Sequence, residues 1–125
     1  MVCLFCLIGC SVQKDDMKKL RDIEYTVLEE RKIPEELLTY IEEAKKEPFE
    51  ITYGDGGYLY IAKGYGTKAT SGYSIVVEEC YETANIICVQ TDLKGPSNDE
   101  ETITQKTYPY IVLKTEYIDK SVVFE

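Results

Sequence analysis

Along most of the chain, hydrophobic and polar residues alternate with the two-residue period that is typical of β-strands. Residues 22–29 show this alternation, and the aromatic and β-branched residues at 25–27 favour a strand over a helix. Residues 49–53 and 58–63 show it again on either side of Asp55 and its neighbouring glycines, which predicts a hairpin. We therefore expect a fold that is rich in β-structure.

A second hairpin is predicted from residues 73–82 and 86–93, with its bend centred on Ala84. In this register Cys80 lies opposite Cys88, on the face away from most of the large hydrophobic residues. The two cysteines could form a cross-strand disulfide in an oxidising compartment or remain free thiols in a reducing one. Free thiols are the preferred interpretation. Neither is expected to be catalytic, because the chain has no histidine to activate a thiol.

One helix is predicted near residues 34–47. Pro34 suits the first turn of a helix, and the two glutamates that follow it meet the positive end of the helix dipole. From Leu37 onward, apolar residues at three- and four-residue spacing form one stripe, which we expect to pack on a sheet. Pro48 is expected to end the helix region.

The C-terminal third of the chain contains an acidic loop at residues 94–101. We interpret it as a solvated loop, because its carboxylates lack the spacing of a calcium loop or of a glycosidase pair. Residues 102–106 are β-like, residues 111–115 are predicted as a strand, and residues 122–124 are predicted as an edge strand. The pattern as a whole predicts an α+β fold, mainly antiparallel β in a sandwich or rolled sheet.

The stretch from Gly64 to Ile75 separates the two predicted hairpins. Glycine reaches positive φ at little cost, so Gly64, Gly66 and Gly72 mark sharp turns or close approaches of the backbone. Hydroxyl side chains and Lys68 lie between them, which predicts a rigid and polar surface loop. Residue chemistry alone assigns this loop no function.

Charge and composition narrow the classes of function. Acidic residues outnumber basic ones by 23 to 14, and the resulting net charge of −9 argues against nucleic acid as a partner. The absence of histidine removes histidine-activated nucleophiles and histidine-ligated zinc. We expect a protein that is not an enzyme and that has no cofactor and no metal site.

Residues 1–10 are uncharged, mostly apolar and end in Cys10. Their last four residues, Leu-Ile-Gly-Cys, resemble the lipobox of bacterial lipoproteins, in which the signal is cut before the cysteine and that cysteine is lipidated. The resemblance implies a truncated signal, a tether at 11–21, and a lipid anchor on the extracellular side of the cell membrane. Two alternatives stay open: the apolar start is a buried strand, or translation begins at Met17 and the protein is cytoplasmic.

Two motifs in the second half of the chain resemble the PrcB family, whose members are lipoprotein-associated subunits named for a surface protease complex. The first motif is Gly66-x-Lys68-x-Thr70-x-Gly72-Tyr73-Ser74-Ile75, and the second is Gln105-x-x-Tyr108-Pro109-Tyr110. The resemblance implies that residues 22–125 form a single PrcB-like domain. It further implies a non-catalytic accessory domain at the cell surface that stabilises a secreted protease or another protein.

The leading hypothesis is that segments 64–74 and 104–110 lie close together and form one protein-contact patch. Exposed tyrosines suit such a patch because they give a large contact area at low entropy cost. The candidate contact residues are Lys68, Thr70, Gly72, Tyr73, Gln105, Tyr108 and Tyr110. A structural role in turns and strand ends is the competing interpretation of the same residues.

A second resemblance supplies an alternative function. Residues 70–74, Thr-Ser-Gly-Tyr-Ser, are similar to a loop of the chagasin-like cysteine-protease inhibitors, which are β-sandwich proteins that bind with three loops. The other loop motifs of those inhibitors are missing from this sequence. The alternatives to an accessory binding domain are therefore a protease inhibitor or a purely structural envelope domain.

Overall fold

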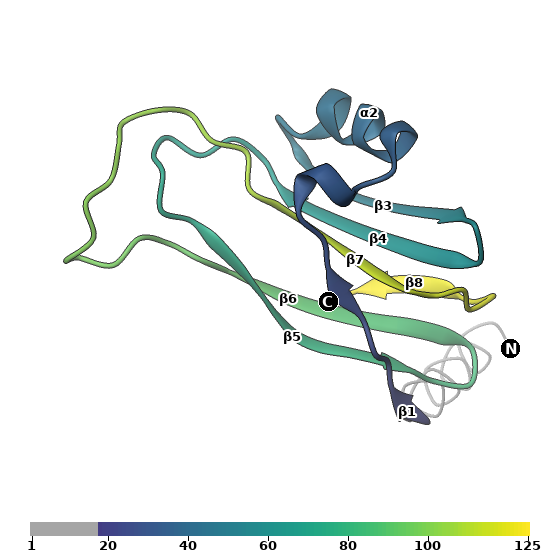
Figure 1. Ribbon diagram of the computed structural model, residues 1–125. Coiled ribbons are helices and arrows are strands. Elements are labelled where there is room, and N and C mark those ends of the chain that lie inside the picture. Colours follow the sequence, from purple (N-terminus) through teal and green to yellow (C-terminus); the bar gives the residue numbers. More distant parts are fainter. Residues whose placement is uncertain (1–17) are drawn as a thin grey trace, which may run out of the picture.

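The computed structural model describes residues 18–125, which form two four-stranded β-sheets and one α-helix (Figure 1). In sheet A the strand order is β1 (Arg21–Asp22), β5 (Ser74–Glu82), β6 (Ile86–Lys94) and β8 (Ser121–Phe124). In sheet B the strand order is β2 (Thr26–Val27), β7 (Tyr110–Glu116), β4 (Tyr58–Tyr65) and β3 (Pro48–Asp55). The expected α+β fold with mainly antiparallel strands is confirmed. The predicted signal with Cys10, and most of the predicted tether, lie outside the described residues.

Sheet B is the middle of three layers, with sheet A on one face and the helix α2 (Glu35–Ala44) on the other (Figure 1). Hydrophobic side chains fill both interfaces. The buried residues between the sheets are Ile23, Leu59, Ile61, Cys80, Ile87, Val89, Ile111 and Leu113. Those between sheet B and the helix are Ile33, Leu37, Ile41, Tyr60, Ala62 and Val112. Residues 59–62 of β4 are all buried, as expected for a strand that is covered on both faces.

The helix predicted near residues 34–47 is confirmed, although it is shorter than expected. Pro34 is the N-cap residue, and the helix itself begins at the glutamate that follows. The side chains of Leu37 and Ile41 are fully buried against sheet B, so the apolar stripe packs on a sheet as predicted. A short 3-10 helix, η1 (Glu30–Lys32), was not predicted.

The single strand predicted at residues 22–29 is wrong, because this segment passes from one sheet to the other. β1 pairs with β5 of sheet A, whereas β2 pairs with β7 of sheet B. Ile23 lies between these short strands, and its side chain is buried in the core between the sheets. One continuous strand cannot pair with both sheets, so the alternation of residues here reflects two separate pairings.

Both predicted hairpins are present. The turn between β3 and β4 is made by Gly56 and Gly57, whose φ angles are 60° and 85°. The β5–β6 hairpin has the predicted register as far as Val77, and a β-bulge then shifts the pairing by one residue. The predicted pairing of the two cysteines is therefore wrong.

The bulge leaves the two cysteines on opposite faces of the hairpin. Cys80 pairs with Val89 and lies in the core between the sheets, whereas Cys88 pairs with Tyr81. Both cysteines are free and buried, so the cross-strand disulfide is not formed. Burial raises the pKa of Cys80 to about 11 and also raises the pKa of Cys88, so both thiols stay protonated at neutral pH.

The C-terminal part departs from the prediction in two ways. Residues 102–106, predicted as β-like, form no strand; the nearest pairing is an isolated bridge between Lys68 and Thr107. The edge strand predicted at 122–124 is confirmed as β8, but β8 pairs with β6 in parallel. The antiparallel pattern of the rest of the sheets did not predict that pairing.

Gly64 provides a direct test of how tightly β3 packs against β4 in sheet B. It lies opposite Phe49 in the β3–β4 pairing, and a Cβ atom at this position would overlap the phenylalanine ring. We predict that Gly64→Ala lowers the free energy of unfolding by about 1–3 kcal/mol, the usual range for overpacking. Urea denaturation measures this change.

The matched control is Gly54→Ala, at the other end of the same hairpin. A Cβ atom on Gly54 would meet the ring of Tyr117 at 3.6 Å and the backbone oxygen of Tyr58 at 4.0 Å, both ordinary contact distances. Its effect on stability should be small. Equal losses of stability in the two variants would contradict the described packing of Gly64.

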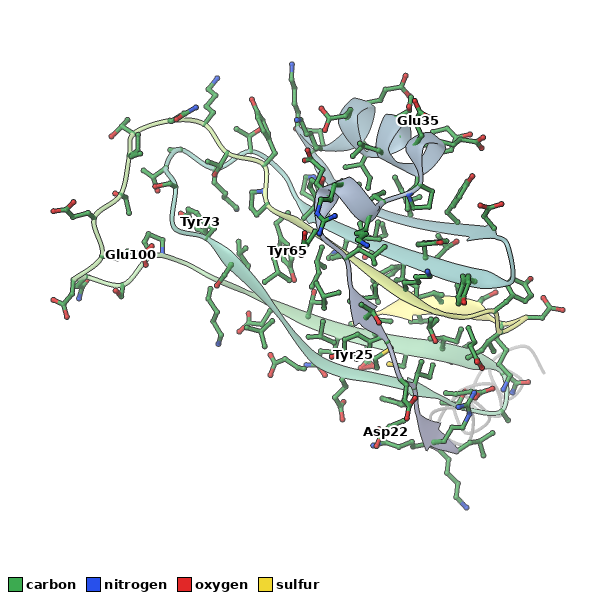
Figure 2. All side chains as sticks on the ribbon, in the orientation of Figure 1. Asp22, Tyr25, Glu35, Tyr65, Tyr73 and Glu100 are labelled. Atoms are coloured by element: carbon green, nitrogen blue, oxygen red, sulfur yellow. The ribbon has the colours of Figure 1, made fainter. Side chains whose placement is uncertain are left out.

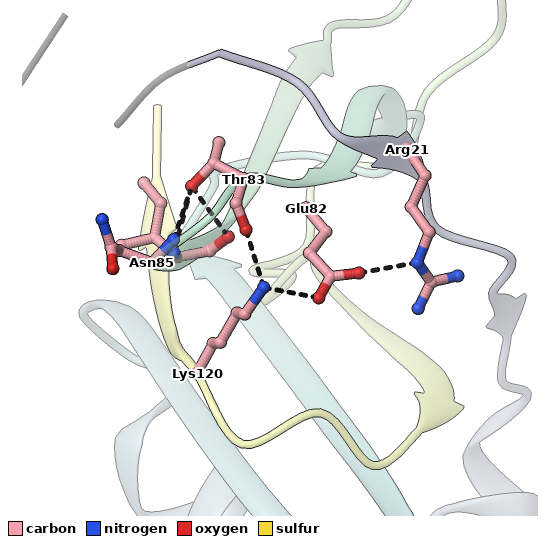
Figure 3. Close-up of polar contacts among 6 residues, drawn as sticks. Arg21, Glu82, Thr83, Asn85 and Lys120 are labelled. Carbon is pink, nitrogen blue, oxygen red and sulfur yellow. Dashed lines mark hydrogen bonds and ion pairs between the residues drawn. The ribbon is translucent and has the colours of Figure 1, made fainter. Parts of the chain in front are cut away.

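A polar network fixes the turn of the β5–β6 hairpin to the rest of the molecule (Figure 3). Lys120 donates hydrogen bonds to the carboxylate of Glu82, at 2.6 Å, and to the backbone oxygen of Thr83, at 2.7 Å. Arg21 donates to the other carboxylate oxygen of Glu82 at 2.7 Å. The hydroxyl of Thr83 accepts hydrogen bonds from two backbone N–H groups of the turn. The network therefore joins three segments of the chain: β1 through Arg21, the hairpin turn, and the segment before β8 through Lys120.

This network makes stability depend on pH. The hydrogen bond from Lys120, helped by Arg21, lowers the pKa of Glu82 in the folded protein. A lowered pKa stabilises the folded state above the unfolded value of about 4.3, and this contribution is lost as the pH falls through the folded value. We predict that Glu82→Gln lowers the melting temperature at pH 7 and that the difference from wild type disappears at low pH.

The control for this experiment is Glu50→Gln. Glu50 pairs with Lys63 across the hairpin, but its side chain is half-exposed, and such pairs contribute little. Melting curves from pH 7 to pH 3 should therefore respond to Glu82→Gln and not to Glu50→Gln. A difference that persists unchanged at pH 3 would contradict the assignment to Glu82.

Candidate protein-contact site

The antiparallel pairing of β4 and β7 brings two distant segments together. Gly64, near the end of β4, pairs with Tyr110, at the start of β7. The chain that leaves β4 and the chain that enters β7 must therefore leave this end of sheet B side by side. Both segments extend beyond the sheets at the left of Figure 1. We call residues 66–73 and 103–109 the joined loops.

Backbone hydrogen bonds continue between the joined loops beyond the end of the sheet. Lys68 and Thr107 exchange two bonds, at 2.8 and 2.9 Å. Farther out, the N–H of Ser71 donates to the oxygen of Ile103 at 3.1 Å, and the N–H of Ile103 donates to the hydroxyl of Ser71 at 2.9 Å. The hydroxyl of Thr107 also donates to the backbone oxygen of Thr70 at 2.8 Å. The predicted proximity of these two segments is confirmed.

The joined loops enclose a shallow depression of about 440 Å³ on the surface. Its walls come from both loops, and they are lined by Thr67, Lys68, Ala69, Thr104, Gln105 and Lys106. Two of the predicted contact residues, Lys68 and Gln105, therefore lie on one surface. The Lys68 ammonium also lies 6.0 Å from the centre of the Tyr73 ring, so Tyr73 is close to this surface.

Gly72 lies where the joined loops meet the acidic loop at 94–101. Its φ angle is 93°, and a Cβ atom there would lie 2.8 Å from both Pro96 and the carboxylate of Glu100. Figure 2 shows Tyr73 at the base of this end of the molecule and Glu100 at its tip. Gly72 is thus required by backbone conformation and close packing, and it has no side chain to offer to a partner.

Tyr108 and Tyr110 lie apart from the depression. The ammonium of Lys45, at the end of α2, lies 5.0 Å from the centre of the Tyr108 ring. Tyr110 packs against the core under the helix, and its hydroxyl donates to Glu30 at 3.3 Å. Burial, with Glu30 beside the hydroxyl, raises the pKa of Tyr110 to about 12. The structure therefore supports a structural role for Tyr110.

Three residues near the depression were missed by the sequence analysis. Ile103 has 64% of its surface exposed, and its place in a β-like run had suggested a strand. Lys46 follows the helix, and its backbone oxygen accepts hydrogen bonds from the N–H and hydroxyl groups of Thr67. Lys106 lines the depression directly. Their positions follow from tertiary contacts that no local pattern reveals.

The charge around the joined loops differs from that of the whole chain. Lys46, Lys68 and Lys106 form no ion pair with any residue in the described part of the chain. Backbone bonds bring these lysines together, because Lys68 pairs with the residue after Lys106 and Thr67 bonds to Lys46. Three lysines without an ion pair in the described part of the chain thus lie on or beside the joined loops, next to the acidic loop, in a protein whose net charge is −9.

A protein-family comparison bears on this site. Residues 59–116 match the model of a family described as PrcB C-terminal. This part of the chain is therefore similar to the PrcB C-terminal family. The PrcB match begins in β4 and ends with β7, so it contains both of the joined loops. No curated protein and no solved structure matches the chain.

The match to the PrcB family suggests a role associated with a protease complex. The PrcB C-terminal domain is an accessory domain of the subunit type and is not a known catalytic family. Among residues 18–125, no three cysteine, aspartate or glutamate side chains are placed to hold a metal ion. The same residues include no helix that is long and apolar enough to cross a bilayer.

Proposed function

We propose that this chain is a non-catalytic accessory domain that binds a protein partner, such as a component of a secreted protease complex, through the joined loops. The observation that carries the proposal is the set of hydrogen bonds that fixes residues 66–73 to residues 103–109. Polar loops that stood alone would lose conformational freedom on binding. Because these two loops are already bonded to each other, less entropy is lost when a partner docks.

Charge complementarity favours a partner with an acidic surface. Lys46, Lys68 and Lys106 form a local group of basic residues on and beside the joined loops, next to the acidic loop at 94–101, whereas the chain as a whole has a net charge of −9. An acidic partner surface would be attracted to the lysines and repelled by most other faces, which orients the encounter. Binding should therefore weaken as the salt concentration rises.

Two apolar groups supply contact area beside the lysines. Ile103 is the more exposed of them, and Tyr73 packs near the ammonium of Lys68. Interfaces commonly combine a central apolar or aromatic contact with a charged rim, and the joined loops have both parts. The contact residues that we retain are Lys68, Thr70, Tyr73 and Gln105, with Lys46, Ile103 and Lys106 added.

The proposal places the domain at the cell surface, anchored by a lipid on Cys10. Support for this comes from the lipobox-like residues at the end of the first ten positions. An anchored domain needs a chain segment between the membrane and its first strand. Residues 11–20 precede β1 and have a polar composition that suits this role.

The binding proposal is tested by affinity purification from the native cell envelope, followed by titration of the captured partner. We predict that Lys68→Ala combined with Lys106→Ala weakens binding by about tenfold, which corresponds to ~1.4 kcal/mol. Lys32→Ala is the matched control, because Lys32 is an exposed lysine of η1 outside the joined loops. The melting temperatures of all variants should equal that of wild type.

Three results would count against this proposal. The first is that the double variant binds the partner as tightly as wild type. The second is that Lys32→Ala weakens binding as much as the double variant does. If the double variant melts early, Gln105→Ala, which changes an exposed side chain, gives a second test of the same surface. A Gln105→Ala protein that binds like wild type would then contradict the proposed site.

The anchoring proposal predicts that the mature protein partitions into detergent and gains the mass of attached acyl chains. Cys10→Ala should abolish both properties, because the thiol is the point of attachment. Cys3→Ala is the matched control within the same segment and should leave them unchanged. Full-length Cys10→Ala protein that still partitions into detergent would contradict lipidation at Cys10.

A further inference from the structure

The outer edge of sheet B is formed by β3, the last strand in the sheet order. β3 pairs along all 8 of its residues with β4, and no strand lies on its other side (Figure 1). The other strands at the ends of the two sheet orders are short: β1 and β2 have 2 residues each, and β8 has 4. β3 is therefore the longest of the strands that end a sheet in residues 18–125.

Half of the backbone groups of β3 point away from β4. The N–H of Tyr65 donates to Pro109 on the β7 side at 3.0 Å, so the neighbouring Gly64 directs its own N–H and C=O groups to β3. Gly64 pairs with Phe49, and every second residue of β3 from Phe49 onward therefore faces β4. The N–H groups that face the open edge are those of Glu50, Thr52 and Gly54.

β3 has few of the features that keep sheet edges from pairing. Its residues include no lysine, and no bulge interrupts its pairing with β4. Its proline, Pro48, is the first residue of the strand, where the missing N–H removes only one outward donor. From Phe49 to Asp55 the edge can therefore accept a further strand.

An added strand would also find apolar surface on the helix side of this edge. Phe49, Ile51 and Tyr53 are half-buried under α2, so part of each side chain is still open. Tyr40 of α2 has 46% of its surface exposed and lies near Tyr53. Aromatic and β-branched side chains stabilise neighbouring strands through such cross-strand contacts.

Carboxylates line the helix side of the same edge. Desolvation raises the pKa of Tyr53, and the nearby carboxylates of Glu36 and Asp55 raise it further. Glu43 lies about two helical turns after Glu36, so it is on the same side of α2. None of these three carboxylates forms an ion pair with another residue from 18 to 125. The edge therefore attracts positive charge.

The face of β3 away from α2 has room for the alternate side chains of an added strand. A depression of about 580 Å³ opens there, and its lining includes Thr52, Gly54 and Tyr117. Leu59, which belongs to the core between the sheets, is part of the same lining. Small apolar side chains suit this position because Gly54 has no side chain to fill it.

The carboxylates disfavour a second copy of this chain as the added strand. Antiparallel pairing of two β3 strands around a two-fold axis would place both α2 helices on the same face of the joined sheet. Glu36 and Glu43 of one copy would then face those of the other, between chains that each have a net charge of −9. A basic segment meets no such repulsion.

We propose that the free edge of β3 binds an extended, basic segment of a partner protein as an additional antiparallel strand. Backbone hydrogen bonds to Glu50, Thr52 and Gly54 hold the segment in this arrangement. Lysines or arginines at alternate positions lie on the helix side, where their aliphatic parts pack on the tyrosines and their charged ends reach the carboxylates. Residues 49–55 lie outside the joined loops, so this proposal and the proposed function can fail separately.

The first test is isothermal titration of the full chain with the capped peptide Lys-Val-Lys-Val-Lys-Val-Lys. In an antiparallel pair, the peptide residues that bond to β3 share a face with Glu50 and Thr52, and these are the valines if the lysines lie on the helix side. Methylating the valine amide nitrogens should therefore weaken binding by about tenfold or more. Methylating the lysine amide nitrogens is the matched control and should weaken it much less.

The second test removes the charges that select a basic segment. Glu36→Gln combined with Glu43→Gln should weaken binding by about fivefold, as expected for the loss of two exposed ion pairs. Glu78→Gln combined with Glu79→Gln is the control, because these exposed glutamates lie on β5 of the other sheet. Binding should also weaken as the salt concentration rises.

The third test blocks the edge itself. Thr52→Pro removes an outward N–H group and should abolish peptide binding, whereas Thr52→Val keeps that group and should bind like wild type. Should Thr52→Pro fail to fold, the methylated peptides still test the edge with the wild-type protein.

Four results would overturn the proposal. The unmodified peptide does not bind, or methylation of the valine amides weakens binding no more than methylation of the lysine amides. A Glu-Val peptide of the same length and alternation binds more tightly than the Lys-Val peptide. The wild-type protein sediments as a dimer that Thr52→Pro dissociates, which would assign the edge to a second copy of this chain.

Discussion

The pairing of β4 with β7 is the constraint on which the rest of this structure depends. These two strands form the centre of sheet B, and their side chains alternate between a core shared with sheet A and a core under the helix. Their antiparallel register places the end of β4 beside the start of β7. The joined loops are therefore neighbours because of how the core is built, and not because of any motif within the loops.

The same pairing determines where the lysines of the joined loops lie. At one end of β4 and β7, the joined loops gather unpaired lysines next to the exposed Ile103. This end of the domain is therefore the surface that we propose for a protein partner.

Much of the fold could be predicted from the sequence, because hairpins and amphipathic helices have local signals. The glycines at 56 and 57 marked one turn, and the stripe from Leu37 marked the buried face of the helix. The errors arose where tertiary structure overrides a local pattern. The bulge before Glu79 moved the cysteines onto opposite faces, and the crossing at Ile23 divided a predicted strand in two. The closeness of the two loops was predicted, but the lysines around them were not, because backbone contacts between distant segments bring them together.

The central claim is that residues 66–73 and 103–109 form one pre-bonded surface, and amide hydrogen exchange measured by NMR tests it most directly. The account predicts slow exchange at the N–H groups of Lys68, Thr107 and Ser71, which donate to partners in the opposite loop. Residues 104–106, which lie between these bonds, should exchange quickly. Exchange of the Lys68 and Thr107 amides at the rate of an unfolded chain, in a protein whose β4 and β7 amides remain protected, would contradict the account.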